Sequence, residues 1–292
     1  MAFRAFGADL RSAKRVVLAL HGTPGSALKY LPASEAADER GLALIAIDRW
    51  GYAGTAAPAP QDQSLAQFGH DIAAVVDRLG VGRVDVVGIS GGGPFALATA
   101  ATLGERVRRV ALVAPVGLLA DERGKPIQGL SRFHHFCFFQ FARKPRLVRA
   151  VFRAFDRILK RNERVGISLG MVRSGAADKV LLDRPDVVGH LARMMREGLS
   201  RNAEGPEIDL RLFPGVAQLS LGAMTHETRI WFGDQDGSVP EAAIVKLSET
   251  LRNATLERVT AQGHFWIATG FPTVLDWLAR DEEGNRSRSG ET

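Results

Sequence analysis

Cysteine is almost absent from this sequence, which has only Cys137 among its 292 residues. A single cysteine excludes an intramolecular disulfide and a metal cluster held by several cysteines, and it is typical of a reducing compartment. Long apolar runs are also lacking. No stretch of about eighteen apolar residues is present to span a membrane, and the opening residues lack the apolar core of a secretory signal. We therefore expect a cytoplasmic protein without stable membrane insertion.

Motifs for nucleotides, nucleic acids and metals are missing as well. No G-x-x-x-x-G-K-[ST] loop follows the first buried strand and no G-x-G-x-x-G opens the first helix, which argues against a nucleotide cofactor. The net charge of +6 is concentrated in residues 121–211, where 19 Lys and Arg stand against 11 Asp and Glu, but no nucleic-acid motif accompanies it. His134, His135 and Cys137 are close in sequence, yet adjacent histidines point to different helix faces. We expect no cofactor, no metal and no nucleic-acid partner.

A regular alternation of strands and helices is present instead. Helical patterns separate the apolar runs, as in the segment that begins at a capping box of Ser64 and Gln67 and ends at Gly80. This order predicts an α/β fold, with a mostly parallel sheet flanked by helices. After a short strand at residues 2–6, the runs expected to form strands are residues 16–20, 42–47, 84–89, 107–113, 228–232 and 255–260.

The strand at residues 84–89 leads directly into the sequence GISGGGPFALA. In this G-x-S-x-G turn, Gly88 and Gly92 remove side chains that would collide, so that Ser90 can adopt a strained backbone with its hydroxyl exposed. Pro94 suits the first turn of the helix that follows. That helix directs unpaired backbone NH groups toward the place where negative charge would develop if Ser90 attacked a carbonyl.

The first glycine-rich loop, HGTPGS, follows the strand at residues 16–20. Loops at the carboxyl ends of parallel strands are where open α/β sheets bind their ligands. For His21, at the start of this loop, we expect a structural role rather than that of a catalytic base, because it stands beside a tight turn.

The alternation stops between residues 117 and 227, which have no comparable strand run and are expected to form several helices. This insertion predicts a helical cap at residues 117–227 on a core domain made of residues 1–116 and 228–292. Its first part is rich in phenylalanine. A second part places basic residues opposite an apolar face that includes Leu147, Val148, Val151 and Leu159. The functional interpretation is a lid over an apolar substrate, and the alternative is a helix packed on its own domain.

Two loops near the carboxyl end carry further polar groups. The loop GDQDGSVP holds the carboxylates of Asp234 and Asp236, and Ser238 and Glu241 are expected to form a capping box at the helix that follows. The last strand leads to His264, and the polar residues 281–292 are expected to form a frayed tail.

Placed in this order, the loops resemble those of the α/β-hydrolase fold family, specifically its capped serine hydrolases. The resemblance rests on HGTPGS, DRWGYAGT, GISGGG, GDQDGSVP and GHF, and it covers nearly the whole chain outside the insertion. It implies that Ser90 is the nucleophile, His264 the general base and then acid, and Asp236 the group that orients the imidazole. It also implies an oxyanion hole made by the backbone NH groups of Thr23 and Gly91.

The family's spacing favours Asp236 over its rival Asp234, because the acid stands three residues after Gly233 and four before Pro240. Two departures from the family pattern occur. The short opening suggests that the first edge strand of the usual eight is missing, and DRWGYAGT replaces the commoner G-x-G-x-S ending.

The function that the resemblance implies is hydrolysis of a carboxylic ester or similar acyl compound through an acyl-enzyme. The G-x-S-x-G turn at residues 88–92 is the nucleophile elbow of this family. A serine at the elbow argues against haloalkane dehalogenases and epoxide hydrolases, relatives that use aspartate there. The phenylalanine-rich insertion favours an apolar small-molecule substrate. Alternatives are an aminopeptidase similar to prolyl iminopeptidases, with Glu204 or Glu207 binding the substrate amine, and a carbon–carbon bond hydrolase. A non-catalytic ligand receptor on the same fold is the alternative from another class.

Overall fold

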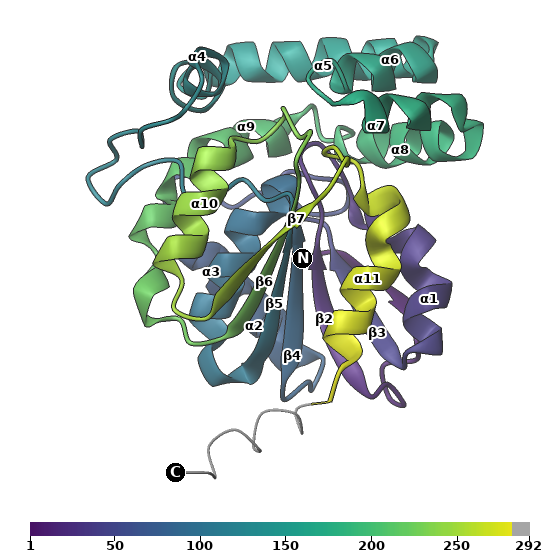
Figure 1. Cartoon of the computed structure of the whole chain (residues 1–292), viewed down its shortest axis with the longest axis vertical. Helices are drawn as coiled ribbons and strands as arrows, with labels where there is room; N and C mark the ends of the chain where they lie inside the picture. Colours follow the sequence, from purple (N-terminus) through teal and green to yellow (C-terminus); the bar gives the residue numbers. More distant parts are fainter. Residues whose placement is uncertain (282–292) are drawn as a thin grey trace.

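The computed structural model describes residues 1–281, which are built around a seven-stranded sheet (Figure 1). The strands lie in the spatial order β1-β3-β2-β4-β5-β6-β7. β1 pairs antiparallel with β3, and the other neighbours are parallel. The mostly parallel sheet predicted from the sequence is therefore confirmed. The strands are β1 (Phe3–Gly7), β2 (Arg15–Leu20), β3 (Leu42–Ile47), β4 (Val84–Ile89), β5 (Val107–Val113), β6 (Glu227–Gly233) and β7 (Ala254–Val259).

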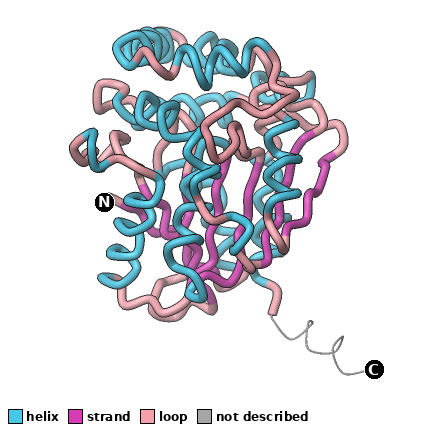
Figure 2. Tube along the Cα trace, turned by 90° about the vertical axis from the view of Figure 1, so that its left-hand side faces the viewer, coloured by secondary structure: helices cyan, strands magenta, loops and turns pink. Residues whose placement is uncertain are grey.

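Helices cover both faces of this sheet (Figures 1 and 2). On one face, α1 (Ser34–Glu39) and α11 (Ile267–Ala279) share a hydrophobic cluster with alternate side chains of β2 and β3. On the other, α2 (Leu65–Arg78), α3 (Gly93–Leu103) and α10 (Glu241–Thr250) pack against the intervening side chains. Burial on both faces explains why these strands read as continuous apolar runs. Among residues 1–281, no helix combines the length and the apolar character needed to cross a bilayer.

The edge of the sheet is formed by the short antiparallel strand β1, whose residues Phe3 to Gly7 pair with Ile47 to Ala43 of β3. Within residues 1–281 the sheet has seven strands, with β1 at this edge and β7 at the other. At the other end of the chain, the polar tail expected from Asp281 lies outside the described residues, apart from Asp281 itself.

The stretch between β5 and β6 is helical, as predicted, and its helices α4 to α8 lie together above the sheet in Figure 1. The phenylalanine-rich residues Phe136–Phe141 form one turn of π-helix, η5. The α-helices of this stretch are α4 (Arg132–His135), α5 (Pro145–Arg161), α6 (Glu163–Gly170), α7 (Ala176–Lys179), α8 (Pro185–Gly198) and α9 (Glu204–Leu212).

The insertion has a hydrophobic core of its own. Side chains of α5, α6 and α8, such as Leu159, Ile167 and Leu191, form a cluster separate from the two that flank the sheet. In contrast, Leu119 and Phe213, near the two ends of the insertion, belong to the cluster on the α3 face of the sheet. The middle of the insertion is thus packed as a unit, while its two ends are anchored in the main core.

Only part of the apolar face expected for α5 is buried. Val148 and Leu159 are buried, but Leu147 and Val151 are 44% and 47% exposed. The buried row continues through the partly buried Phe152, four residues after Val148, which is the spacing of one helix face. The sequence showed an amphipathic helix, but not which edge of its apolar stripe would meet a partner.

The capping box expected at Ser238 and Glu241 is wrong. The N-cap of α10 is Pro240, and no side chain caps this end of the helix. The reason is that Asp236 holds the loop instead, since its Oδ1 accepts hydrogen bonds from the backbone NH groups of Ser238 at 2.8 Å and Val239 at 3.3 Å. The capping box at the start of α2 is only half formed: Ser64 Oγ accepts a bond from the NH of Gln67.

Candidate active site

Ser90 stands between β4 and α3, on the turn that the sequence predicts to be strained. Its φ of +53° lies in the left-handed region, which side chains other than glycine seldom adopt. The glycines on either side are required by close packing. A Cβ atom on Gly88 would lie 2.7 Å from that of Ala96, and one on Gly92 would lie 2.3 Å from the carbonyl oxygen of Leu20. The turn can therefore form only with this pattern of glycines, and it leaves Ser90 partly exposed.

The structure brings Ser90, His264 and Asp236 together from three separate loops. The Nε2 atom of His264 lies 3.0 Å from Ser90 Oγ, and its Nδ1 atom lies 2.7 Å from Asp236 Oδ2. Because a carboxylate only accepts hydrogen bonds, Nδ1 carries the hydrogen and Nε2 is left to accept the serine proton. This is the geometry in which an imidazole can activate a hydroxyl group.

Asp234 and Asp236, the two candidate acids, lie in different environments. The side chain of Asp236 is fully buried, and its two oxygens are occupied by His264 and by the backbone of its own loop. Asp234 is exposed. Only Asp236 is therefore placed to orient the imidazole.

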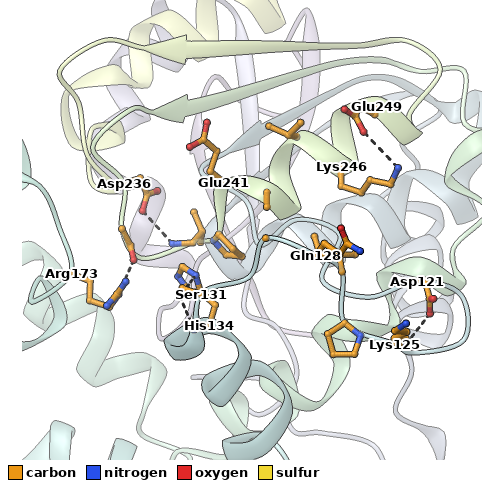
Figure 3. A pocket seen from close by; sticks show the side chains of 18 residues that line it. Asp121, Lys125, Gln128, Ser131, His134, Arg173, Asp236, Glu241, Lys246 and Glu249 are labelled. Atoms are coloured by element: carbon orange, nitrogen blue, oxygen red, sulfur yellow. Dashed lines mark hydrogen bonds and ion pairs between the residues drawn. The ribbon is translucent and has the colours of Figure 1, made fainter.

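A surface cavity of about 920 Å³ lies beside the loop at residues 233–240, which carries Asp236 and is called the acid loop below (Figure 3). Asp236 lines it together with His134 and Arg173, and Figure 3 shows these three side chains close to one another. Ser90 and His264 are not among its lining residues. The cavity thus lies on the side of the acid loop that faces away from the hydroxyl group of Ser90.

One segment of the insertion, residues 173–178, contacts both the acid loop and the loop that carries His264, which is called the histidine loop below. Arg173 Nε donates to the carbonyl oxygen of Gly237 at 2.9 Å. The buried carboxylate of Asp178 accepts hydrogen bonds from the backbone NH groups of His264 at 2.7 Å and Phe265 at 2.9 Å. Sequence reasoning missed Asp178, because nothing local distinguishes it from other helix carboxylates. We assign it as a positioning residue for the loop that carries the imidazole.

Opposing effects act on the pKa of His264. Burial of the imidazole lowers the pKa, but the charge and hydrogen bond of Asp236 together with the charge of Asp178 outweigh it, so that the pKa lies above its ordinary value. A general base must be unprotonated before it acts. Activity that depends on His264 should therefore rise with pH through this raised pKa.

We expect Asp178→Asn to move the acid limb of the kcat/KM profile to lower pH, because it removes a negative charge that favours imidazolium. The measurement is kcat/KM for a neutral ester between pH 5 and 9. Asp183→Asn, at an exposed ion pair with Arg164, is the matched control and should leave the limb in place. An acid limb unchanged in Asp178→Asn would contradict this role for Asp178.

The two residues predicted to form the oxyanion hole lie against each other beside Ser90. A Cβ atom on Gly91 would lie 2.1 Å from Thr23 Oγ1, so the loop carrying Thr23 touches the backbone of the elbow. Gly91 is in the first turn of the helical segment that begins at Ser90, where backbone NH groups have no acceptor within the helix. The structure therefore brings these two residues together next to Ser90.

A buried ion pair ties this loop to the insertion. Asp209, on α9, is 1% exposed and pairs with the fully buried Arg49, which follows β3. The same carboxylate also accepts hydrogen bonds from the hydroxyl groups of Thr23 and Tyr52. Burial raises the pKa of Asp209, while Arg49 opposes the rise. Asp209 was not singled out from the sequence, although it holds the side chain of a predicted oxyanion residue.

Asp209→Ala should lower the free energy of unfolding by about 3–5 kcal/mol, because it leaves the Arg49 charge buried without its partner. Urea denaturation followed by tryptophan fluorescence measures this change. The control is Asp183→Ala, whose exposed ion pair contributes less than about 1 kcal/mol. Equal losses in the two variants would show that the buried pair is not what holds this part of the fold.

His21 has the structural role expected for it. Its Nδ1–H donates to the carbonyl oxygen of Gly22 at 2.8 Å, and its Nε2 accepts from the NH of Arg49 at 3.2 Å. Burial, with the nearby Arg49 charge, lowers its pKa well below the ordinary value. A neutral ring with both nitrogens bonded to backbone serves to hold two loops together. No group of three His, Cys, Asp or Glu suited to a metal ion occurs in residues 1–281.

Comparison with curated proteins gives one partial match. A 2-hydroxymuconate semialdehyde hydrolase from Pseudomonas putida is 40% identical over 75 residues, which make up 26% of this chain and 27% of that protein. The match therefore spans about a quarter of the length of that curated relative. It identifies a related segment rather than a shared activity.

Solved structures resemble the chain over almost its whole length. An enol-lactonase from Burkholderia xenovorans has a TM-score of 0.71 with 17% identity, and each chain is covered to 96%. An esterase from Exiguobacterium antarcticum has a TM-score of 0.66 with 19% identity, covering 96% of this chain and 95% of the esterase. A bromoperoxidase from Bacillus anthracis has a TM-score of 0.68 with 20% identity, covering 94% and 92%. At these identities, the likeness is one of fold.

A single family model spans strands β2 to β7, the insertion and the loops of the site. The model is described as the alpha/beta hydrolase fold, and it matches residues 15–271, which is most of the chain. The elbow glycines, the left-handed Ser90 and the mostly parallel sheet are consistent with this match. The chain belongs to the alpha/beta hydrolase fold family.

Proposed function

We propose that the protein is a serine hydrolase that cleaves a carboxylic ester or a similar acyl compound through an acyl-enzyme. The observation that carries this proposal is the 3.0 Å contact between Ser90 Oγ and His264 Nε2, with Asp236 2.7 Å from the opposite ring nitrogen. Membership of the family supports hydrolase activity in general. The partial match to a curated hydrolase agrees with it.

In the proposed mechanism, His264 takes the proton of Ser90 as its oxygen attacks the substrate carbonyl. The backbone NH groups of Thr23 and Gly91 stabilise the oxyanion of the tetrahedral intermediate, and Asp236 stabilises the imidazolium. His264 then gives its proton to the leaving alcohol, and the acyl group stays on Ser90. In the second half of the reaction, His264 activates a water molecule, which releases the acid and restores the serine.

We further propose that the middle of the insertion is a cap over this site and that the acyl group is apolar. Aromatic side chains support this. The ring of Phe213 reaches within 2.9 Å of where a Cβ atom on Gly91 would lie. The ring of Phe138 packs edge-on against that of Phe213, with 6.1 Å between the two ring centroids. Phe265 lies beside His264 and packs against the cluster formed by α5, α6 and α8.

A series of p-nitrophenyl esters from acetate to octanoate tests this function. We expect kcat/KM to rise with acyl length by up to about fourfold per methylene group, which corresponds to about 0.8 kcal/mol of apolar burial. A preference for acetate over every longer chain would count against an apolar acyl site. Failure to hydrolyse any ester of the series would count against the esterase assignment.

The aminopeptidase alternative needs carboxylates that are free to bind a substrate amine, and its two candidate acids already pair with an arginine. Glu207 is buried and lies 2.9 Å from Arg149, and Glu204 lies 3.7 Å from the same guanidinium group. Carboxylates that are already neutralised by an arginine are poorly placed to bind a substrate amine. A carbon–carbon bond hydrolase remains the second candidate, supported by the partial match to a protein named 2-hydroxymuconate semialdehyde hydrolase.

A further inference from the structure

Lys29 is a buried cation without a counter-ion. It lies in the 3-10 helix η1 (Ala27–Ala33), directly after the HGTPGS loop that carries Thr23, and it is 7% exposed. Within residues 1–281, its ammonium group forms no hydrogen bond and no ion pair. Lysines are almost never buried to this degree unless they are paired.

The isolation of Lys29 is costly, which points to a function. Burial lowers its pKa to about 8, so the side chain is still mostly protonated near neutral pH. A buried charge is normally compensated by a partner or removed by a larger change in pKa. Within the described residues Lys29 has no charged partner, and its pKa is not lowered far enough to remove the charge at neutral pH. An anionic ligand would supply the missing partner.

A second unpartnered nitrogen, on α8, lies within electrostatic range of Lys29. The Nε2 atom of His190 is buried and has no hydrogen-bond partner in the part of the chain that the structure describes. Burial lowers the pKa of His190, and the charges of Lys29 and Arg193 lower it further. α8 packs closely on the segment that precedes η1, since a Cβ atom on Gly198 would lie 2.0 Å from the carbonyl oxygen of Gly25.

Acids near this place are already engaged. Glu197, on α8, accepts hydrogen bonds from Arg4 and Ser26. Asp48 accepts a hydrogen bond from the backbone NH of Ala27 at 2.7 Å. Neither carboxylate pairs with Lys29, so the ammonium remains available to a ligand.

Lys29 also lies close to the reactive centre. Its charge disfavours protonation of His264 and is one of the influences that lower the pKa of that imidazole. Lys29 is therefore within electrostatic reach of the histidine that contacts Ser90. An anion bound at Lys29 would neutralise this charge and make His264 a stronger base while substrate is present.

We propose that Lys29, assisted by His190, binds a carboxylate at the far end of the acyl chain, so that the preferred substrate is an apolar acyl ester that ends in an anion. This inference rests on the proposed serine hydrolase function and specifies its substrate class. One ammonium group and one imidazole match the single charge of a carboxylate. The cluster around Leu28, Met194 and Leu191 supplies apolar surroundings for the chain between the two ends.

The test compares p-nitrophenyl monoesters of succinic, glutaric, adipic and suberic acids with their methyl-capped neutral counterparts. For the best chain length, we expect kcat/KM to be at least about tenfold higher for the ester with a free carboxylate, which is the effect of one hydrogen bond to a charged group. Lys29→Met should bring this ratio close to one. The exposed Lys144→Met removes a charge elsewhere and should leave the ratio unchanged.

The pH dependence of the same ratio needs no variant. Both esters require His264, so its titration cancels, and His190 is already neutral above pH 7 because its pKa is lowered. Arg193 is the other cation whose charge acts on His190. As kcat/KM reports the free enzyme, the preference for the anionic ester should decline as pH rises through about 8, where Lys29 loses its proton.

The outcomes separate the two proposals. Efficient hydrolysis of the neutral esters with no preference for any carboxylate in the wild-type protein would overturn the anion site and leave the serine hydrolase assignment standing. A preference that survives both Lys29→Met and a rise to pH 9.5 would also overturn it. Failure to hydrolyse either kind of ester would overturn both proposals.

Discussion

Replacing Ser90 with alanine is expected to reduce kcat for ester hydrolysis by about 10⁵ to 10⁶, because the variant has no hydroxyl group to form the acyl-enzyme. A small residual rate should persist, since the proposed oxyanion donors remain in place. The fold should be retained, because the tight turn depends on the flanking glycines rather than on the hydroxyl. The rate is measured with a p-nitrophenyl ester at high enzyme concentration.

Ser200→Ala provides the control for this prediction. Ser200 is exposed at the end of α8 and belongs to neither the elbow nor its supporting loops, so its variant should hydrolyse the ester at the wild-type rate. A Ser90→Ala protein that keeps more than about a tenth of the wild-type rate would remove Ser90 from the proposed mechanism.

The second large effect is expected at Asp236. Asp236→Asn should lower kcat by about 10⁴, because an amide can donate to Nδ1 and stabilise the tautomer that cannot accept the serine proton. The side chain is fully buried, and its Oδ1 also receives two backbone hydrogen bonds, which asparagine can keep. The measurement is kcat for the same ester, with circular dichroism to show that the loop change has not unfolded the protein.

Asp234→Asn is a matched control for this substitution, because it makes the same chemical change two residues away at an exposed position. We expect it to change kcat by less than about twofold, as is usual for surface substitutions away from functional contacts. If Asp234→Asn were the damaging variant and Asp236→Asn the neutral one, the roles given to the two acids would be reversed.

Much of the core could be predicted from the sequence because its signals are local. Strands buried on both faces leave continuous apolar runs, and the runs at residues 42–47 and 84–89 coincide with β3 and β4. The turn at Ser90 could also be predicted from its glycines, because steric contacts permit no side chain at Gly88 or Gly92. The chain order of the loops then gave the candidate residues that the structure brings together.

The supporting residues outside the motif loops could not be predicted in the same way. Asp178, Asp209 and Lys29 resemble ordinary helix residues in the sequence, and their importance comes from what tertiary packing places beside them. An amphipathic pattern defines a helix face but not its partner, and on the apolar face of α5 Leu147 and Val151 are exposed while Val148 and Leu159 are buried. The expected cap at Ser238 failed for a related reason, since Asp236 accepts a hydrogen bond from the backbone NH of Ser238, which the side chain of Glu241 would take in a capping box.

The position of these residues suggests how the insertion and the core depend on each other. Asp178 holds the backbone of the histidine loop, and Asp209 holds Thr23 beside the elbow. Both carboxylates come from the helical insertion, whereas Ser90, His264 and Asp236 come from the core. We infer that the insertion supports the geometry of the site in addition to the cap role proposed for it, so that removing it should abolish activity rather than only broaden specificity.

The most direct test of the central claim is covalent labelling with a fluorophosphonate probe, followed by peptide mass spectrometry. The account predicts one phosphonate adduct per chain, located on Ser90, with no labelling of Ser90→Ala and strongly slowed labelling of His264→Ala. A folded wild-type protein that takes up no probe, or that carries it on another residue, would contradict the claim and favour a ligand receptor on the same fold.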